Sequence, residues 1–253
     1  MKTSEYLEGL RREGELLAAA VARADLAAPV PPCPEWQVRD LVQHIGTVHR
    51  WAAAIVRERF GDRPNPAETE KLRGPLPDDA DWVGWFRAGH ANLLDTLATA
   101  DPEADCWHFY PAPSGHAFWV RRQLHETAIH RVDAEAAAGG GLTPVPPAVA
   151  LDGVDELLAG MHNLDRSQVR SQRPRLLRIH ATDAPAGHGD WYVRLTAEHP
   201  RTERTGDPAA AECTLSGTAE ELYLTLWNRP APGEITVEGD AALYELWRTT
   251  SAI

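Results

Sequence analysis

Residues 121–133 read RRQLHETAIHRVD and place a carboxylate and an imidazole where they can share one face of a helix. Glu126 and His130 are four positions apart, so both side chains project from the same side of the helix. Asp133 follows three positions later and lies close to that face. The spacing differs from that of HExxH, because His125 and His130 are five positions apart, which argues against a zincin protease. The stretch therefore predicts two ligands of a metal site.

A metal site needs at least one more ligand, and the segment from about 35 to 60 offers His44 and His49. Its apolar positions predict a helix, and facing helices of a bundle donate ligands inward to a shared site. Two histidines and one carboxylate, with a fourth position open, form the usual ligand set of catalytic zinc. Such an open position binds a thiol or a water and promotes its deprotonation. The spacing leaves the choice between the two histidines open.

Helical apolar periodicity recurs through the N-terminal part of the chain. The predicted helices cover about residues 3–26, 35–60, 79–99 and 116–138. Proline-rich stretches at 28–34 and 64–66 are expected to be irregular connections, and the glycines at 139–141 end the last helix. Helices of this length, joined by moderate loops, predict a four-helix bundle.

Beyond the prolines at 144–147, the pattern changes to short strands alternating with helices. Thr218 and Glu221 have the spacing of a capping box at the start of one of these helices. The predicted helices are 148–163, Thr218–Trp227 and Asp240–Arg248, and the predicted strands are Arg175–Thr182, Trp191–Thr196, Glu212–Ser216 and Ile235–Glu238. The sequence therefore predicts an α+β protein with a helical domain at 1–150 and a small α+β domain at 151–253.

Composition narrows the class of protein. The formal net charge of −12 disfavours nucleic acid as a partner, because an acidic chain repels polyphosphate. Cys33, Cys106 and Cys213 lie far apart and form no CxxC pair, which favours reduced thiols in the cytosol. The charged N-terminal residues do not resemble a signal peptide, and no apolar run is long enough for a transmembrane helix. We therefore expect a cytoplasmic protein with no membrane partner.

Several stretches of the sequence occur together in one known family. WQVRDLVQH at 36–44, FWVRR at 118–122 and HETAIHRVD at 125–133 resemble the mycothiol-dependent maleylpyruvate isomerase family, whose members share a DinB-like four-helix metal-binding domain. LSGTAEEL at 215–222, LWNR at 226–229 and VEGD at 237–240 resemble the smaller C-terminal domain of that family. The resemblance covers nearly the whole chain.

The resemblance implies a set of site residues. The family's zinc ligands correspond to His44, Glu126 and His130, so the resemblance selects His44 as the third ligand. His49 then either lines the site or lies at the helix surface, and we favour the surface. It also implies mycothiol, a low-molecular-weight thiol of actinobacteria, as cosubstrate. Arg229 is the candidate for an arginine of the C-terminal domain that helps to hold an anionic substrate.

The expected function is that of a zinc enzyme that activates mycothiol as a thiolate for isomerisation of, or S-transfer to, a small electrophilic substrate. One alternative is a zinc–water hydrolase, such as an amidase acting on thiol conjugates, and another is a metal- or thiol-binding protein without catalysis. Asp133 is a candidate for the catalytic machinery, where it either orients a ligand histidine or pairs with Arg131 or Arg121 as a structural salt bridge. We expect the chain to act as a monomer or homodimer.

Overall fold

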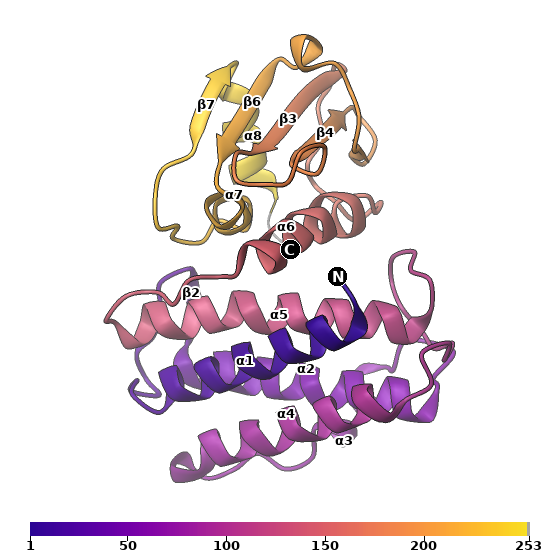
Figure 1. The fold of residues 1–253 in the computed structure, drawn as a ribbon. Coiled ribbons are helices and arrows are strands. Elements are labelled where there is room, and N and C mark those ends of the chain that lie inside the picture. The colour runs from indigo at the N-terminus through magenta and orange to yellow at the C-terminus, as the bar shows by residue number, and fades with distance from the viewer. Residues whose placement is uncertain (252–253) are drawn as a thin grey trace. The chain divides into compact units, whose positions relative to one another are not determined.

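Four long helices form the core of the first unit, Met1–Thr143, in a computed structural model that describes residues 1–251 (Figure 1). They are α1 (Thr3–Val21), α2 (Val38–Glu58), α4 (Trp82–Thr99) and α5 (Gly115–Ala138). Helix α1 packs against α4 and α5, and α2 packs against the same two helices. Apolar side chains from α1, α2 and α4, among them Leu17, Ile45 and Phe86, are fully or almost fully buried between them. The predicted four-helix bundle is confirmed.

The first helix ends five residues earlier than predicted, at Val21 rather than at residue 26. The residues that follow it bond to the start of α2 instead of continuing α1. The N–H of Val38 donates to the carbonyl of Ala28 at 3.0 Å, and the N–H of Arg39 donates to that of Leu26 at 3.0 Å. These bonds hold the connecting segment against the first residues of α2.

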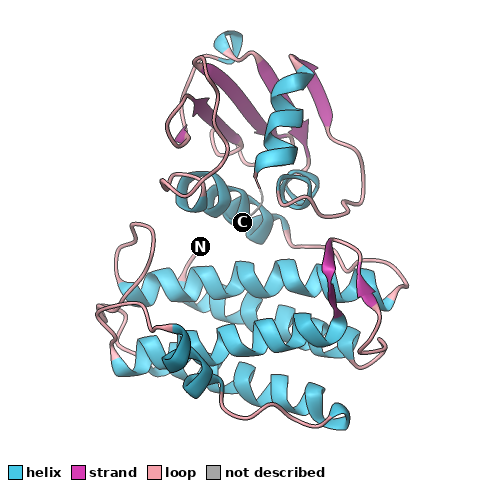
Figure 2. Cartoon of the chain, turned by 180° about the vertical axis from the view of Figure 1, so that it is seen from behind, coloured by secondary structure: helices cyan, strands magenta, loops and turns pink. Residues whose placement is uncertain are grey.

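The segment that was expected to be irregular contains an antiparallel hairpin, β1 (Pro29–Val30) and β2 (Cys33–Gln37), which Figure 2 shows as two short strands beside the helices. Its first strand is short and begins with a proline, a residue that is tolerated at strand starts and edges because it has no N–H to donate. The side chain of Val30 is fully buried in the helical core. The hairpin packs against α2 and α5.

A short helix, α3 (Pro66–Arg73), also replaces an expected loop. Asn65 caps it by accepting a hydrogen bond from the N–H of Glu68 at 3.0 Å, and the Glu68 carboxylate accepts one from the N–H of Asn65 at 2.7 Å. This capping box, followed by proline at the first helical position, is a recognisable helix start. None of the residues of α3 is buried, so apolar periodicity gave no indication of it.

The second unit, from Pro144 to the chain end, contains a mixed sheet within its described residues. The strand order is β5-β4-β3-β6-β7, in which β3 and β6 are parallel and the other neighbours are antiparallel. The strands are β3 (Arg175–Ala181), β4 (Asp190–Leu195), β5 (Arg201–Glu203), β6 (Cys213–Gly217) and β7 (Thr236–Gly239). Strand β5 was not predicted from the sequence. The α+β class is confirmed.

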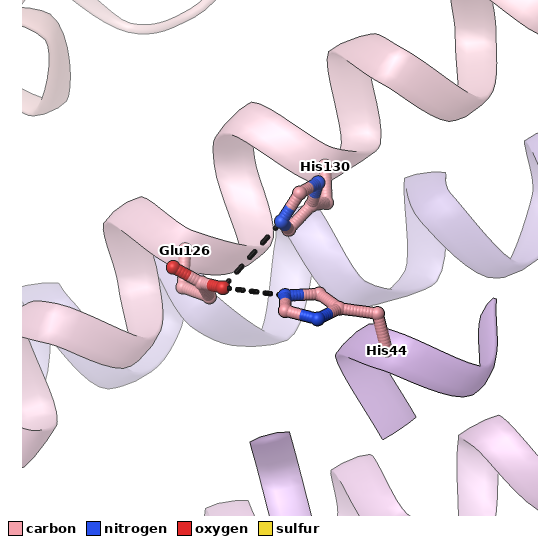
Figure 3. Close-up of side chains that lie close together, drawn as sticks. All are labelled: His44, Glu126 and His130. Carbon is pink, nitrogen blue, oxygen red and sulfur yellow. Dashed lines mark hydrogen bonds and ion pairs between the residues drawn. The ribbon is translucent and has the colours of Figure 1, made fainter. Parts of the chain in front are cut away.

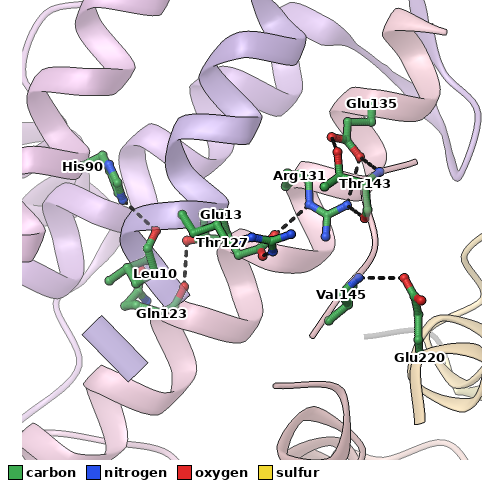
Figure 4. A network of polar contacts seen from close by, with 11 residues as sticks. Leu10, Glu13, His90, Gln123, Thr127, Arg131, Glu135, Thr143, Val145 and Glu220 are labelled. Atoms are coloured by element: carbon green, nitrogen blue, oxygen red, sulfur yellow. Dashed lines mark hydrogen bonds and ion pairs between the residues drawn. The ribbon is translucent and has the colours of Figure 1, made fainter. Parts of the chain in front are cut away.

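The helices of the second unit are α6 (Pro147–Asp155), which continues as a π-helical segment to Met161, α7 (Ala219–Leu226) and α8 (Ala241–Thr250). Thr218 and Glu221 form the predicted capping box at α7. Helix α6 packs against α7, and the N–H of Val145 donates to Glu220 on α7 at 2.7 Å (Figure 4). The division between the units therefore falls at Thr143–Pro144, ahead of α6, whereas the sequence placed it at residue 150. Across residues 1–251, no helix combines the length and the apolar character needed to cross a membrane.

Candidate metal centre

His44, Glu126 and His130 lie together in the first unit, with His44 on α2 facing the other two residues on α5 (Figure 3). One potential ligand atom from each side chain lies within 4.8 Å of the other two. Nε2 of His44 is 3.0 Å from Oε1 of Glu126, and Nε2 of His130 is 3.4 Å from the same oxygen. Both imidazoles thus present a nitrogen to one carboxylate oxygen.

Helix α5 carries these polar side chains through the interior of the bundle. Ser114 caps the helix by accepting a hydrogen bond from the N–H of Ala117 at 3.0 Å, and most of the following residues up to Glu135 are buried. The four-residue spacing then places Glu126 and His130 on one side of α5. A polar pair in such a buried helix needs partners, because unpaired polar groups are costly in the interior.

Arg122 provides the main charge partner of Glu126. Its Nη2 donates to Oε2 of Glu126 at 2.8 Å and leaves Oε1 for the two histidines. Burial would raise the pKa of Glu126, but the charge of Arg122 and the hydrogen bonds to His130 and His44 outweigh burial and hold that pKa well below its usual range. Glu126 is therefore a carboxylate, the form that ligates a metal.

His130 is oriented by Asp133, whose Oδ2 lies 2.9 Å from Nδ1 of His130. A proton on Nδ1 bonded to this carboxylate leaves Nε2 directed toward Glu126 and His44. Of the two roles considered for Asp133, the structure shows the contact with a predicted ligand histidine. Arg131 instead pairs with Glu13 and Glu135.

The prediction that His49 lies at the helix surface is wrong. His49 is fully buried, and its Nε2 lies 2.9 Å from the hydroxyl of Thr127. Five positions along a helix turn a side chain by about 140°, so His49 cannot project from the same side of α2 as His44. Burial, assisted by the nearby His90, lowers the pKa of His49 well below its usual value. The structure thus assigns His49 to the core.

Two residues of the β1–β2 hairpin also lie at the centre, and neither was predicted from the sequence to belong to the site. The indole ring of Trp36 lies 4.9 Å from the ring of His44 and 5.7 Å from that of His130, measured between centroids. The Sγ atom of Cys33 lies 3.7 Å from Oδ2 of Asp133. Their proximity follows from a hairpin that the proline-rich sequence did not reveal.

A cavity of about 1150 Å³ opens beside His44, between α2, the hairpin and α3. Its lining includes Trp36 and Trp51, together with Arg63, Glu70 and Arg73 from the segment that contains α3. Aromatic faces combined with a few converging polar groups are typical of small-molecule sites. His44 is the most exposed of the three candidate ligands, with 37% of its side-chain surface accessible, and it connects the centre to this cavity.

Arg229 belongs to the second unit, where it follows α7. Its Nη1 donates to the carbonyl of Trp227 at 2.8 Å, and the preceding residue, Asn228, has a positive φ of 55°. Arg229 lines a cavity of about 720 Å³ within that unit, together with Tyr244 and Arg248. This cavity places a guanidinium group where a small molecule has access to it.

The affinity of the centre for zinc should depend on pH. Burial would lower the pKa of His130, but hydrogen bonds to Asp133 and Glu126 outweigh it and raise this pKa to about 9. At pH 7 a metal must then displace a proton from His130, so we expect the apparent affinity to rise about tenfold per pH unit up to about pH 9 and then to level off. Competition with a chelator of known proton affinity measures this. A constant affinity between pH 7 and 9 would contradict it.

Comparisons with known proteins agree on one family. A family model described as "Mycothiol maleylpyruvate isomerase N-terminal domain" matches residues 7–135, and one described as "MDMPI C-terminal domain" matches residues 148–246. Two crystal structures of the mycothiol-dependent maleylpyruvate isomerase, one of them a histidine-to-alanine mutant, superpose with a TM-score of 0.61. They are 12% and 14% identical, and the match covers 94% of this chain and 93% of theirs, which shows a shared fold. No curated protein sequence matches the chain.

Proposed function

The chain belongs to the mycothiol maleylpyruvate isomerase family, and from this premise we propose that it is a zinc enzyme that uses mycothiol to isomerise a small electrophile or to transfer sulfur to it. The observation that carries the proposal is the convergence of His44, Glu126 and His130 beside a cavity. A cytoplasmic location belongs to the same proposal, in keeping with free thiols at Cys33, Cys106 and Cys213.

The donor set suits zinc. Two imidazole nitrogens and one carboxylate oxygen are the ligands of many catalytic zinc sites, in which a fourth position stays open. Asp133 forms a hydrogen bond with His130, and Arg122 forms one with Glu126. Metal-bound histidines and carboxylates usually have such hydrogen-bond partners. When bound, zinc would lower the pKa of a thiol at the open position and so supply a thiolate near neutral pH.

The cavity beside His44 supports a small-molecule substrate. Its volume of about 1150 Å³ is sufficient for a thiol and a small electrophile, and its Trp36 and Trp51 rings offer apolar contact area. A thiolate at the His44 end is the nucleophile for an electrophilic carbon. In an isomerisation the thiolate adds to a carbon–carbon double bond, rotation follows about the resulting single bond, and the thiolate leaves again. In an S-transfer the thiolate forms a carbon–sulfur bond while halide leaves or an epoxide C–O bond opens, and the thioether is the product.

Arg229 is our candidate for the group that holds an anionic part of the electrophile. A guanidinium binds carboxylates with two parallel hydrogen bonds, and Arg229 lines a cavity of its own unit. Asp133 acts as a positioning residue in this proposal, since it contacts a ligand histidine and is itself fully buried.

Turnover that depends on added thiol tests the proposal. We expect the zinc-loaded protein to isomerise maleylpyruvate, or to consume a halogenated or epoxide electrophile, only when mycothiol is present. His44→Ala should reduce the rate at least a hundredfold, because it removes a ligand of the site that activates the thiol. Hydrolysis of a thiol conjugate without added thiol would favour an amidase instead. Thiol binding without reaction on any of these electrophiles would favour a non-catalytic binding protein.

A further inference from the structure

The β1–β2 hairpin contacts the candidate metal centre with two side chains, Cys33 and Trp36. Cys33 approaches Oδ2 of Asp133 at 3.7 Å, within hydrogen-bonding distance for a sulfur donor. The same oxygen accepts the hydrogen bond from Nδ1 of His130 at 2.9 Å. A chain of contacts therefore runs from the hairpin through a carboxylate to a ligand histidine.

The side chain of Asp133 is fully buried, so its orientation is set by contacts with the protein. Its carboxylate comes from the same helix as His130, one turn further on, and can rotate about its own side-chain bonds. Cys33 comes from a separate element, so its S–H restrains that rotation from outside α5. Since the orientation of the carboxylate sets the orientation of the imidazole, Cys33 acts on His130 through Asp133.

Trp36 acts on the imidazoles directly. Its ring stacks on that of His130, with an interplanar angle of 26°, and lies tilted by 47° against that of His44. The centroids of the His44 and His130 rings are 4.9 Å apart. One indole ring therefore packs against two neighbouring ligands that come from different helices. It covers one side of both imidazoles and limits their rotation.

The hairpin is anchored firmly enough to position these side chains. Val30 is fully buried in the core, and the backbone bonds from Val38 to Ala28 and from Arg39 to Leu26 join the ends of the hairpin segment to the start of α2. We propose that the β1–β2 hairpin is a positioning element of the metal centre, in which Cys33, through Asp133, and Trp36, by ring packing, hold His130 and His44 in the ligating orientation. The inference rests on the proposed zinc binding and is independent of any thiol chemistry.

A double-mutant cycle on zinc affinity tests the role of Cys33. Asp133→Ala should weaken zinc binding about 10- to 100-fold, as is usual for the partner of a ligand histidine. Cys33→Ala should weaken it several-fold, because a thiol is a weaker donor, and Cys33→Ser should restore it by keeping a donor at this position. In the Asp133→Ala background, Cys33→Ala should have no further effect, since its contact is already lost.

The possible outcomes separate the two proposals. If the wild-type protein binds no zinc in competition with a chelator, the metal centre itself is wrong. If it binds zinc and Cys33→Ala leaves the affinity unchanged, or lowers it equally with and without Asp133, the inference about Cys33 is overturned. Thermal unfolding of the metal-free variants, expected to match the wild type within a few degrees, shows that the fold is retained.

Cobalt absorption tests the role of Trp36. We expect Co²⁺ bound to Trp36→Leu to show a shifted d–d band, because both imidazoles lose the ring that restrains them. Trp36→Phe keeps an aromatic face and should give a spectrum close to that of the wild type. Identical spectra for Trp36→Leu and the wild type would overturn this part of the inference. The Cys33 cycle remains decisive for the hairpin if Trp36→Leu does not fold.

Discussion

Glu126→Gln is expected to abolish stoichiometric zinc binding, whereas the wild-type protein should hold about one zinc per chain. Glutamine keeps the size of the side chain but removes the charge on the oxygen that both imidazoles approach. It also leaves Arg122, which is almost completely buried, without the carboxylate that accepts its hydrogen bond at 2.8 Å. Without the negative charge of Glu126, the three ligands are neutral, and the nearby positive charge of Arg122 repels a metal ion. Elemental analysis of purified protein measures the result.

Glu70→Gln is the matched control for this substitution. Glu70 lines the same cavity, but its side chain is 74% exposed and it is not one of the three converging residues. We expect its zinc content to equal that of the wild type. His44→Ala should also lose the metal, and it tests the ligand that comes from the other helix. If Glu126→Gln and His44→Ala both retain full zinc content, the metal centre is in the wrong place.

Residue spacing in the sequence was enough to predict two of the three candidate metal ligands. Glu126 and His130 were predictable because four residues make little more than one helical turn, whatever the rest of the chain does. The choice between His44 and His49 was different, because both lie on the same apolar helix and only the packing of α2 against α5 decides which one faces inward. The resemblance to a family made that choice, and the structure now places His44 at the centre and His49 in the core.

The elements that the sequence analysis missed are those that owe little to apolar periodicity. Helix α3 has no buried residue and is marked at its start by a capping box at Asn65, which a search for buried faces overlooks. The β1–β2 hairpin is held by Val30 in the core and by backbone bonds to α2, so it depends on a partner that is already folded. Residues of both elements line the cavity. The part of the site that could not be predicted from the sequence is therefore mostly the lining of this cavity.

The partner of Asp133 was also undecidable from the sequence. Arg131 is two positions away and was an equal candidate for a salt bridge with it. In the structure, Glu13 reaches Arg131 from α1, 118 positions earlier in the chain, and its Oε2 lies 2.7 Å from Nε of the arginine. Asp133 instead lies 2.9 Å from Nδ1 of His130, and Sγ of Cys33 also lies 3.7 Å from its Oδ2. The contact of Arg131 with Glu13 is long-range, so the spacing of residues 131 and 133 could not reveal it.

Arg131→Ala should destabilise the protein by about 3 kcal/mol, because this arginine is the cation of buried ion pairs with Glu13 and Glu135 (Figure 4). Besides Glu13, its guanidinium bonds Oε2 of Glu135 at 2.9 Å and the carbonyl of Thr143 at 2.6 Å. Breaking a buried ion pair typically costs about 3–5 kcal/mol. The lower end applies, since Arg12 also contacts Glu13 and Thr143 donates to Glu135. Urea unfolding measures the change in the free energy of unfolding.

Arg87→Ala provides the matched comparison, because Arg87 also pairs with a glutamate on α1, but at the surface. It lies 3.4 Å from Glu15, with the two side chains 51% and 59% exposed, and such exposed pairs contribute at most about 1 kcal/mol. Equal losses in the two variants would mean that burial does not strengthen the Arg131 network. Arg131 projects about 100° away from His130 around α5, toward α1. Arg131→Ala should therefore keep its zinc at temperatures where it is folded, which separates the stability of the bundle from the metal centre on the same helix.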